Sequence, residues 1–154
     1  MVSPDQVEQL TALDVLLVRL DQEIYALPTA SVREVARHRP PTPVPGAPPA
    51  LPGIINQRGA ILPVVDLRLI LGLPQALPTR STRLVVLTHE DVDMALLVDA
   101  VLDLATLPPE AFEPAPLALD PARARLIRGV ARQEDGHVIL LDLSELIAAL
   151  RDWS

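Results

Sequence analysis

The stretch GIINQRGAILPVVDLRLIL, residues 53–71, has an echo in GVARQEDGHVILLDLSELI, residues 129–147. Aligning the two segments from end to end places glycine on glycine, glutamine on glutamine and Asp-Leu on Asp-Leu. An internal echo of this kind indicates two copies of one folding unit. The copies differ at the turn, where the first reads Asn56-Gln57-Arg58-Gly59 and the second reads Glu134-Asp135-Gly136.

The region upstream of each echo also repeats, in an alignment that places Ala26-Leu27 on Ala95-Leu96 and Val32 on Val101. Short alternating apolar runs bounded by turn residues predict strands. Each copy then reads strand, strand, strand, proline-rich crossing, strand, strand, helical turn. The predicted strands are residues 15–20, 23–27, 32–37, 54–58 and 61–66 in the first copy and 83–88, 92–98, 101–107, 127–132 and 137–141 in the second.

The two crossings are rich in proline. Residues 40–52 hold seven of the 17 prolines, and residues 108–121 hold five. Proline lacks an amide hydrogen, so neither crossing can be a central strand or a helix interior, and extended polyproline segments with turns are predicted. The spacings Pro40-x-x-Pro43 and Pro45-x-x-Pro48 also match ligands of proline-binding modules, although a stiff crossing needs the same residues.

Helical turns are predicted at three places. Asp66 is placed to cap a turn that ends at Gly72, and Asp142 is placed to cap a C-terminal helix over 143–151. Ser3, followed by a proline and a capping-box glutamine, predicts a short helix at 3–13.

This order of elements predicts the fold class. No crossover helix of about ten residues separates the strands, so two small five-stranded barrels fit better than a parallel sheet. The protein is therefore expected to be mostly β, with one domain over residues 1–150, a first barrel near 13–76 and a second near 80–150.

Composition excludes several function classes. The chain carries 13 Lys/Arg against 20 Asp/Glu, and this net charge of −7 opposes nucleic acid and anionic membrane surfaces. Only Tyr25, Phe112 and Trp153 are aromatic, which disfavours base stacking, and the absence of cysteine excludes disulfides and thiolate chemistry. The sequence shows no signal peptide and no apolar run long enough to span a bilayer, so a cytoplasmic protein without a membrane span is expected.

The matched aspartates suggest an enzymatic alternative. Two halves that each supply one carboxylate could form a pseudo-symmetric hydrolase from Asp66 and Asp142. Such sites need Asp-Thr/Ser-Gly, whereas these aspartates precede Leu67-Arg68 and Leu143-Ser144, so helix capping is favoured. Retained activity in an Asp66→Asn/Asp142→Asn variant would remove the alternative.

No metal or cofactor site is predicted. The three histidines, His38, His89 and His137, lie far apart without zinc-ligand spacing, and each is expected at a solvated turn or strand end. Residues 89–93 are acidic but lack the glycine and terminal glutamate of a calcium loop. No catalytic residue is assigned.

The turn that distinguishes the first copy is the strongest candidate for recognition. Arg58 offers five donors in a rigid fork, which suits a carboxylate or backbone carbonyls of a partner. Gly59 permits a positive φ or the close approach of another backbone. Asn56 can hold the turn through its side chain or bond outward.

The segment GIINQRGAILPVVDLR resembles the signature of the CheW family of bacterial chemotaxis coupling proteins, in which Asn-Leu-Arg-Gly precedes Pro-Val-Val-Asp-Leu-Arg. Upstream, Tyr25-Ala-Leu-Pro and Ser31-Val-Arg-Glu-Val resemble the family's first barrel. Downstream, Leu96-Leu-Val-Asp99 and Leu140-Leu-Asp-Leu143 resemble the second. The resemblance covers about residues 13–150.

The resemblance implies two intertwined SH3-like barrels without enzymatic activity. It also implies an adaptor between the regulatory domain of a CheA-type histidine kinase and the cytoplasmic tip of methyl-accepting chemoreceptors, recruited to membrane-associated receptor arrays. The family's receptor contact lies near the signature arginine. The positions that match are Arg58, Asn56, Gly59, Gly53, Val32 and Glu34. Kinase-contact residues remain unassigned.

Two departures from the family pattern leave alternatives open. Gln57 replaces the common leucine, and a buried amide needs a partner. Both crossings are unusually rich in proline. The chain could therefore serve another receptor–kinase pathway, such as surface motility, or bind a kinase but no receptor.

Overall fold

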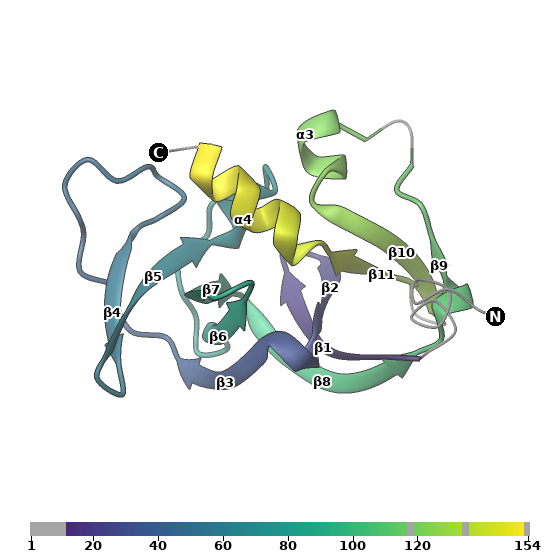
Figure 1. The fold of residues 1–154 in the computed structure, drawn as a ribbon, viewed down its shortest axis with the longest axis horizontal. Coiled ribbons are helices and arrows are strands. Elements are labelled where there is room, and N and C mark those ends of the chain that lie inside the picture. Colours follow the sequence, from purple (N-terminus) through teal and green to yellow (C-terminus); the bar gives the residue numbers. More distant parts are fainter. Residues whose placement is uncertain (1–11, 117–118, 134–135, 153–154) are drawn as a thin grey trace.

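The strands form two curled sheets that lie side by side in the computed structural model, which describes residues 12–116, 119–133 and 136–152 (Figure 1). The first half contains β1 (Leu13–Leu20), β2 (Glu23–Pro28), η1 (Thr29–Ser31), β3 (Val32–Arg37), β4 (Gly53–Gln57), β5 (Ala60–Asp66) and α2 (Leu67–Ile70). The second contains β6 (Arg83–His89), β7 (Val92–Val98), β8 (Ala100–Leu107), η2 (Pro109–Ala111), β9 (Phe112–Glu113), α3 (Pro121–Ala124), β10 (Ile127–Gln133), β11 (Gly136–Leu141) and α4 (Leu143–Asp152). The ten predicted strands are confirmed, with small differences at their ends. The helix predicted at 3–13 lies outside the described residues, except that Leu13 begins β1.

Equivalent strands of the two copies occupy equivalent places in the two sheets. One sheet has the order β8-β1-β2-β11-β10-β9, and the other has the order β3-β6-β7-β5-β4. The repeat matches β8 with β3, β1 with β6, β2 with β7, β11 with β5 and β10 with β4. Each sheet therefore draws strands from both halves, and the expectation of intertwined, pseudo-symmetric barrels is confirmed. The predicted barrel ranges 13–76 and 80–150 follow the two copies in the sequence, whereas each sheet takes strands from both ranges.

The apolar residues form one shared core and two smaller barrel cores. The shared core lies between the sheets and takes residues from both, together with α2 and α4. The two barrel cores use equivalent positions, because five of the six buried residues in one correspond through the repeat to buried residues in the other. These pairs are Val15/Leu84, Ala26/Ala95, Ala131/Ile55, Val138/Leu62 and Leu140/Val64. An aliphatic pattern that repeats in sequence thus builds each barrel in the same way.

Each proline-rich crossing is attached to the sheet edge at the same place. Thr42 exchanges two backbone hydrogen bonds with Ile54 of β4, at 2.8 and 2.9 Å. In the second crossing β9 pairs with Val130 and Ala131 of β10. Strand β9 has two residues, and the sequence did not predict it. The spacing Pro45-x-x-Pro48 is interrupted by a turn, since Gly46 has a φ of +83°.

These attachments explain the shared glycine of the two echoes. A Cβ on Gly53 would lie 2.3 Å from the Thr42 carbonyl oxygen, and a Cβ on Gly129 would lie 3.3 Å from the Glu113 carbonyl oxygen. The crossing backbone runs directly over both glycines. The presence of glycine in both copies therefore follows from the close approach of two backbones.

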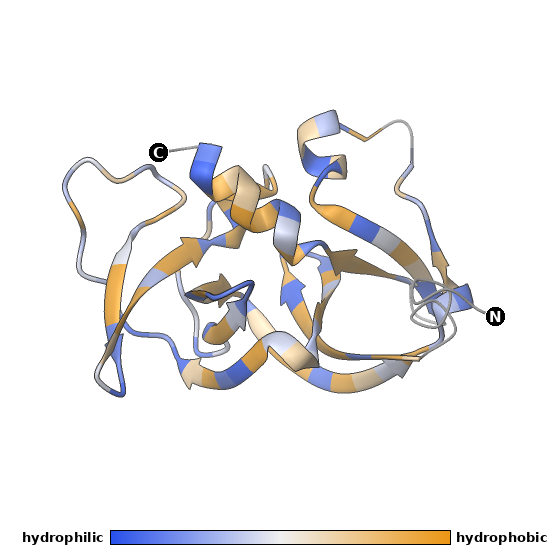
Figure 2. Cartoon of the chain, in the orientation of Figure 1, coloured by the Kyte–Doolittle hydropathy of each residue, from blue (hydrophilic) through white to orange (hydrophobic). Residues whose placement is uncertain are grey.

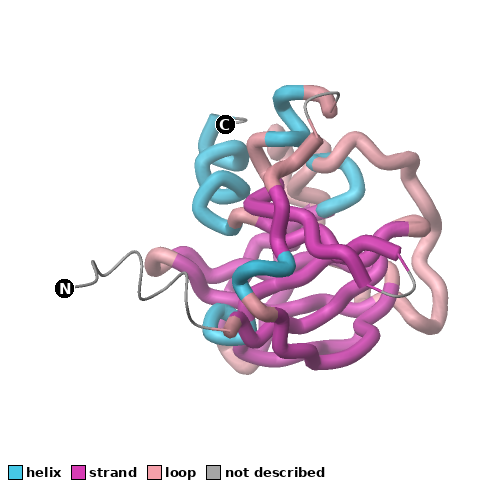
Figure 3. Tube along the Cα trace, turned by 90° about the vertical axis from the view of Figure 1, so that its right-hand side faces the viewer, coloured by secondary structure: helices cyan, strands magenta, loops and turns pink. Residues whose placement is uncertain are grey.

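The shared aspartates are helix caps, as predicted. Asp66 Oδ1 accepts hydrogen bonds from the amides of Arg68 and Leu69, at 3.1 and 3.4 Å. Asp142 Oδ1 accepts one from the amide of Glu145 at 3.0 Å. These bonds satisfy amides in the first turns of α2 and α4, the role that capping requires. Most helical turns, α4 included, gather at one end of the strands (Figure 3).

Candidate protein-interaction site

The turn between β4 and β5 presents the signature arginine. Gln57 pairs with Ala60, so Arg58 and Gly59 form a two-residue hairpin turn, with φ values of +54° and +87°. Two positive φ values are typical of a type I′ turn. Asn56 Oδ1 accepts a hydrogen bond from the Gly59 amide at 2.9 Å, so the asparagine holds the turn. The Arg58 side chain is 80% exposed.

Glu34 on β3 holds the Nε end of the Arg58 guanidinium. Its Oε2 accepts a hydrogen bond from Arg58 Nε at 2.8 Å, and its Oε1 accepts one from the Gln57 amide nitrogen. These two hydrogen bonds, from Gln57 and then from Arg58, hold the pKa of the Glu34 carboxyl below its usual range. The carboxylate therefore stays charged and keeps the guanidinium oriented.

The departure from the family pattern at Gln57 is satisfied by polar partners. Arg39 Nη2 donates to Gln57 Oε1 and to the Asn56 carbonyl oxygen, at 2.6 Å each. Glu34 accepts from the other end of the amide. Gln57 therefore links β3, the start of the first crossing and β4. Since β3 and β4 are the two edges of one sheet, this network closes the barrel through side chains.

Not all candidate residues lie in this network. Glu34, Asn56, Arg58 and Gly59 come together, whereas Val32 is half-buried and packs against the shared core. Gly53 is buried at the opposite end of β4, beneath the crossing. Ile61, beside Asn56 in the β4–β5 pairing, is 60% exposed and was not predicted as a site residue. An outward-facing isoleucine next to a turn was the signal that could have found it.

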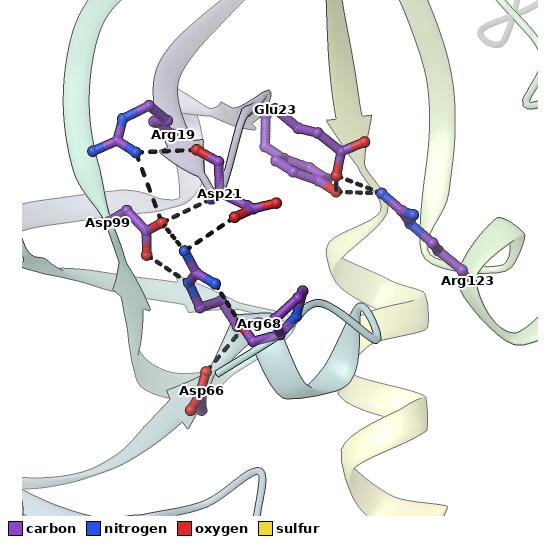
Figure 4. Close-up of polar contacts among 9 residues, drawn as sticks. Arg19, Asp21, Glu23, Asp66, Arg68, Asp99 and Arg123 are labelled. Atoms are coloured by element: carbon purple, nitrogen blue, oxygen red, sulfur yellow. Dashed lines mark hydrogen bonds and ion pairs between the residues drawn. The ribbon is translucent and has the colours of Figure 1, made fainter. Parts of the chain in front are cut away.

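A second polar cluster, which the sequence did not predict as a unit, lies between the barrels (Figure 4). Arg68 of α2 makes a bidentate pair with Asp99 in the β7–β8 turn, with Nε–Oδ1 and Nη2–Oδ2 distances of 2.9 and 2.6 Å. Asp21 of the β1–β2 turn donates its amide to Asp99 Oδ2 at 2.7 Å and places Oδ1 3.6 Å from Arg68 Nη2. This arginine and Asp99 are only 12% and 20% exposed. Because this cluster joins the two barrels of the chain to each other, we call it the first docking point.

Asp99 is ionised by its partners. Burial alone would raise the pKa of its carboxyl, but hydrogen bonds from Arg68 and the Asp21 amide lower that pKa below its usual range. Burial raises the pKa of the neighbouring Asp66, against the opposing effect of its capping amides. Folding therefore makes the Asp99 carboxyl harder to protonate and the Asp66 carboxyl easier to protonate.

The equivalent cluster in the other half contains a histidine. His89 Nδ1 lies 3.1 Å from Ser31 Oγ, and His89 Nε2 lies 3.0 Å from Ser144 Oγ of α4. Ser144 also donates to Glu90, whose Oε1 is 3.4 Å from His89 Nε2. We call this cluster the second docking point. His89 is the last residue of β6, a strand end as predicted, but it is half-buried and hydrogen-bonded rather than simply solvated.

Tyr25 anchors the second crossing. Its hydroxyl donates to Glu23 Oε1 at 2.8 Å and accepts from Arg123 of α3 at 3.0 Å. Burial, followed by the hydrogen bond to Glu23, raises the pKa of Tyr25 to about 12.

In the described part of the chain, no group of three His, Asp or Glu side chains could hold a metal ion.

An apolar groove of about 270 Å³ lies beside α4. It is lined by Leu51, Pro63, Val65, Val92, Met94, Ile147, Leu150 and Arg151.

No described helix is long and apolar enough to cross a membrane.

Comparisons with known proteins agree on one family. The family model described as the CheW-like domain matches residues 14–151. Chemotaxis protein CheW of Bacillus subtilis (strain 168) is 30% identical over 123 residues, covering 80% of this chain and 79% of the relative. Protein FrzA of Myxococcus xanthus is 32% identical over 126 residues, covering 81% and 79%. The crystal structure of scaffolding protein TtCheW from Thermoanaerobacter tengcongensis matches with a TM-score of 0.79 and 27% identity, covering 86% of each chain.

Proposed function

The chain belongs to the CheW-like domain family, and from this premise we propose that it is a non-enzymatic adaptor that couples chemoreceptor tips to a CheA-type histidine kinase. It works in the cytoplasm, recruited to membrane-associated receptor arrays, and binds the regulatory domain of the kinase. The observation that carries the proposal is the Arg58 turn. This turn is the part of the echo in which the first copy carries an arginine and the second does not.

Arg58 is the receptor-contact residue in this proposal. Its Nε is bonded to Glu34, whereas its two terminal nitrogens project into solvent on an 80% exposed side chain. A guanidinium held at one nitrogen loses less conformational entropy when the other two bind a carboxylate or carbonyl pair. Asn56 and Gly59 set the turn, and Glu34 sets the direction of the fork. Val32 and Gly53 contribute by shaping the β3 and β4 edges.

The mechanism is geometric. One rigid body with two interfaces fixes the position of the kinase relative to the receptor. The receptor's signalling state shifts the kinase equilibrium only if the two states contact the adaptor differently. The shared core, which takes residues from both sheets, supports transmission through a single body.

Two alternatives within the same class remain as proposals. Similarity to protein FrzA, as well as to chemotaxis proteins, favours a relative that serves another receptor–kinase pathway, such as surface motility. The other alternative is an adaptor that binds a kinase but no receptor. Separate co-purification with each partner distinguishes these cases.

The test is an Arg58→Glu variant titrated with a receptor-tip fragment and, separately, with the kinase regulatory domain. We expect receptor affinity to fall at least about tenfold, because the positive charge that binds the receptor becomes a negative one, while kinase affinity stays unchanged. The unfolding midpoint should fall only slightly, because Glu34 loses an exposed ion-pair partner. Arg132→Glu, an equal charge reversal on the exposed surface of β10, is the matched control. Unchanged receptor affinity in Arg58→Glu would remove Arg58 from the site.

A further inference from the structure

Charge is unevenly distributed along this acidic chain. All 13 cationic side chains are arginine. Residues 31–83 hold seven of them against two carboxylates, Glu34 and Asp66, whereas the other residues hold six against 18. The chain is therefore acidic overall and locally basic. The basic stretch contains β3 to β5 and the beginning of β6.

Four of these arginines, besides the one in the Gln57 network, lack a carboxylate partner. Among the described residues, Arg33, Arg37, Arg80 and Arg83 form no ion pair within 4.0 Å, although five other arginines do. Arg33 and Arg37 lie on edge strand β3, Arg83 begins its neighbour β6, and Arg80 lies in the turn that precedes β6. We call these four residues the arginine edge. A chain with an excess of acids could have paired them. Their charges are therefore not neutralised by carboxylates within the described part of the chain.

The arginine edge places like charges side by side. Arg37 and Arg83 are direct cross-strand partners in the β3–β6 pairing. Like charges at such positions destabilise a sheet. Arg83 Nη1 donates to the carbonyls of Arg80 and Thr82, at 2.7 and 2.9 Å, so it is oriented by neutral groups. The fold tolerates a repulsive pair here, and a negatively charged ligand would relieve it.

An apolar residue lies within the same edge. Val35, between the two arginines of β3, is 43% exposed. Hydrophilic and hydrophobic residues both occur along β3 (Figure 2), and its burial alternates, so Arg33, Val35 and Arg37 are the exposed positions. A ligand that matches it must carry anionic groups separated by an apolar one, which is the chemistry of an acidic peptide segment.

We propose that the arginine edge binds an acidic segment of a partner protein. Carboxylates of that segment pair with Arg37 and Arg83, and an apolar side chain rests on Val35. A nucleic acid fits less well, because its continuous charge would meet the acidic remainder of the chain and no exposed aromatic side chain is available for stacking in the described residues. The inference does not depend on Arg58, whose Nε is already bonded to Glu34.

The experiment uses the full chain and a fluorescein-labelled peptide of alternating Glu and Leu, followed by fluorescence anisotropy at low and high salt. We expect salt-sensitive binding that falls at least about fivefold in Arg37→Glu/Arg83→Glu. Arg128→Glu/Arg132→Glu carries the same change in net charge on β10 and should bind as the unaltered chain does. Equal losses in both variants would reduce the effect to net charge and overturn the proposal.

A stability measurement separates recognition from a structural role. Arg37→Glu turns the repulsive cross-strand pair into an attractive one, so it should raise the thermal midpoint while weakening peptide binding. A lowered midpoint together with weaker binding would show that the edge serves the fold and would overturn the proposal. Tighter binding of single-stranded DNA than of the peptide would do the same.

Discussion

The two halves of the molecule join their barrels at equivalent positions with different chemistry. In the first docking point Arg68 of α2 meets Asp21 of the β1–β2 turn, and in the second Ser144 of α4 meets Glu90 of the β6–β7 turn. The repeat matches Arg68 with Ser144 and Asp21 with Glu90. Asp21 and Glu90 both have positive φ values, +58° and +49°. The two turn residues thus share a left-handed backbone conformation, but their side-chain contacts differ. One copy uses a bidentate ion pair, and the other uses hydroxyls and a histidine.

This difference teaches where a duplicated fold concentrates its stability. The Arg68–Asp99 pair is largely shielded from solvent, so its charges are screened little. The loss of either partner leaves the desolvation of the other uncompensated. Glu90, by contrast, is 57% exposed, and its bonds compete with water. We therefore expect the first docking point to dominate the resistance of the two sheets to separation.

The largest effect is predicted for Asp99→Ala. It leaves the Arg68 guanidinium without its bidentate acceptor and frees the Asp21 amide. The free energy of unfolding should fall by about 3 kcal/mol, near the lower end for a broken buried pair because both groups retain some exposure. Urea unfolding followed by circular dichroism measures it.

The control for that prediction is an Arg68→Met/Asp99→Leu double variant, which replaces both charges with apolar side chains. It should recover part of the loss, since neither charge is left without its counterion, while the Asp21 amide lacks its acceptor in both variants. If the double variant is as unstable as Asp99→Ala, packing rather than charge explains the first docking point.

A second comparison concerns the glycines beneath the two crossings. Gly53→Ala would bring a methyl group within 2.3 Å of a backbone oxygen, whereas Gly129→Ala would bring it within 3.3 Å. We expect losses of about 2 kcal/mol and less than about 1 kcal/mol, respectively, because the first requires the crossing to move. Thermal unfolding of both variants decides this, and equal losses would contradict the difference in approach.

Much of this fold could be predicted from the repeat. The strands, the caps at Asp66 and Asp142 and the barrel cores all follow local patterns that occur twice. The exchange of strands between sheets was expected only from the family resemblance, since strand periodicity does not say which strands pair. Strand β9 was not predicted because so short a strand carries no periodicity.

The sites were less predictable for a related reason. Asn56, Arg58 and Gly59 could be grouped because they adjoin in sequence, but Arg68, Asp99 and Asp21 come from three separate turns far apart along the chain. The docking points depend on partners that only the tertiary fold brings together. The role of Gln57 between Glu34 and Arg39 has the same origin. The departure from the family pattern drew attention to Gln57, while its partners lie on β3 and at the start of the first crossing.

A smaller effect concerns acid. The pKa of Asp99 is lower in the folded chain than its usual value of about 3.9, so its stabilisation is complete above that value and is lost as pH falls through the folded pKa. Asp66, whose pKa is raised by burial, contributes in the opposite direction. Asp99→Asn should therefore flatten the decline of stability below pH 4, as measured by urea midpoints from pH 7 to pH 3. An unaltered slope would contradict the assignment, and Ser144→Ala, which changes no charge, supplies the control.

The smallest effect should come from copying one docking point onto the other. Ser144→Arg places an arginine opposite Glu90, as Arg68 lies opposite Asp21, but at a more exposed position and without an equivalent of Asp99, because Ala30 stands there. We expect a stabilisation of no more than about 0.5 kcal/mol, the usual range for an exposed pair. A double-mutant cycle with Glu90→Gln, read by urea unfolding, isolates the coupling between the two side chains. A coupling as large as that between Arg68 and Asp99 would show that exposure does not separate the two docking points. A small one would locate the difference in the half-buried carboxylate of Asp99, which has no equivalent in the second docking point.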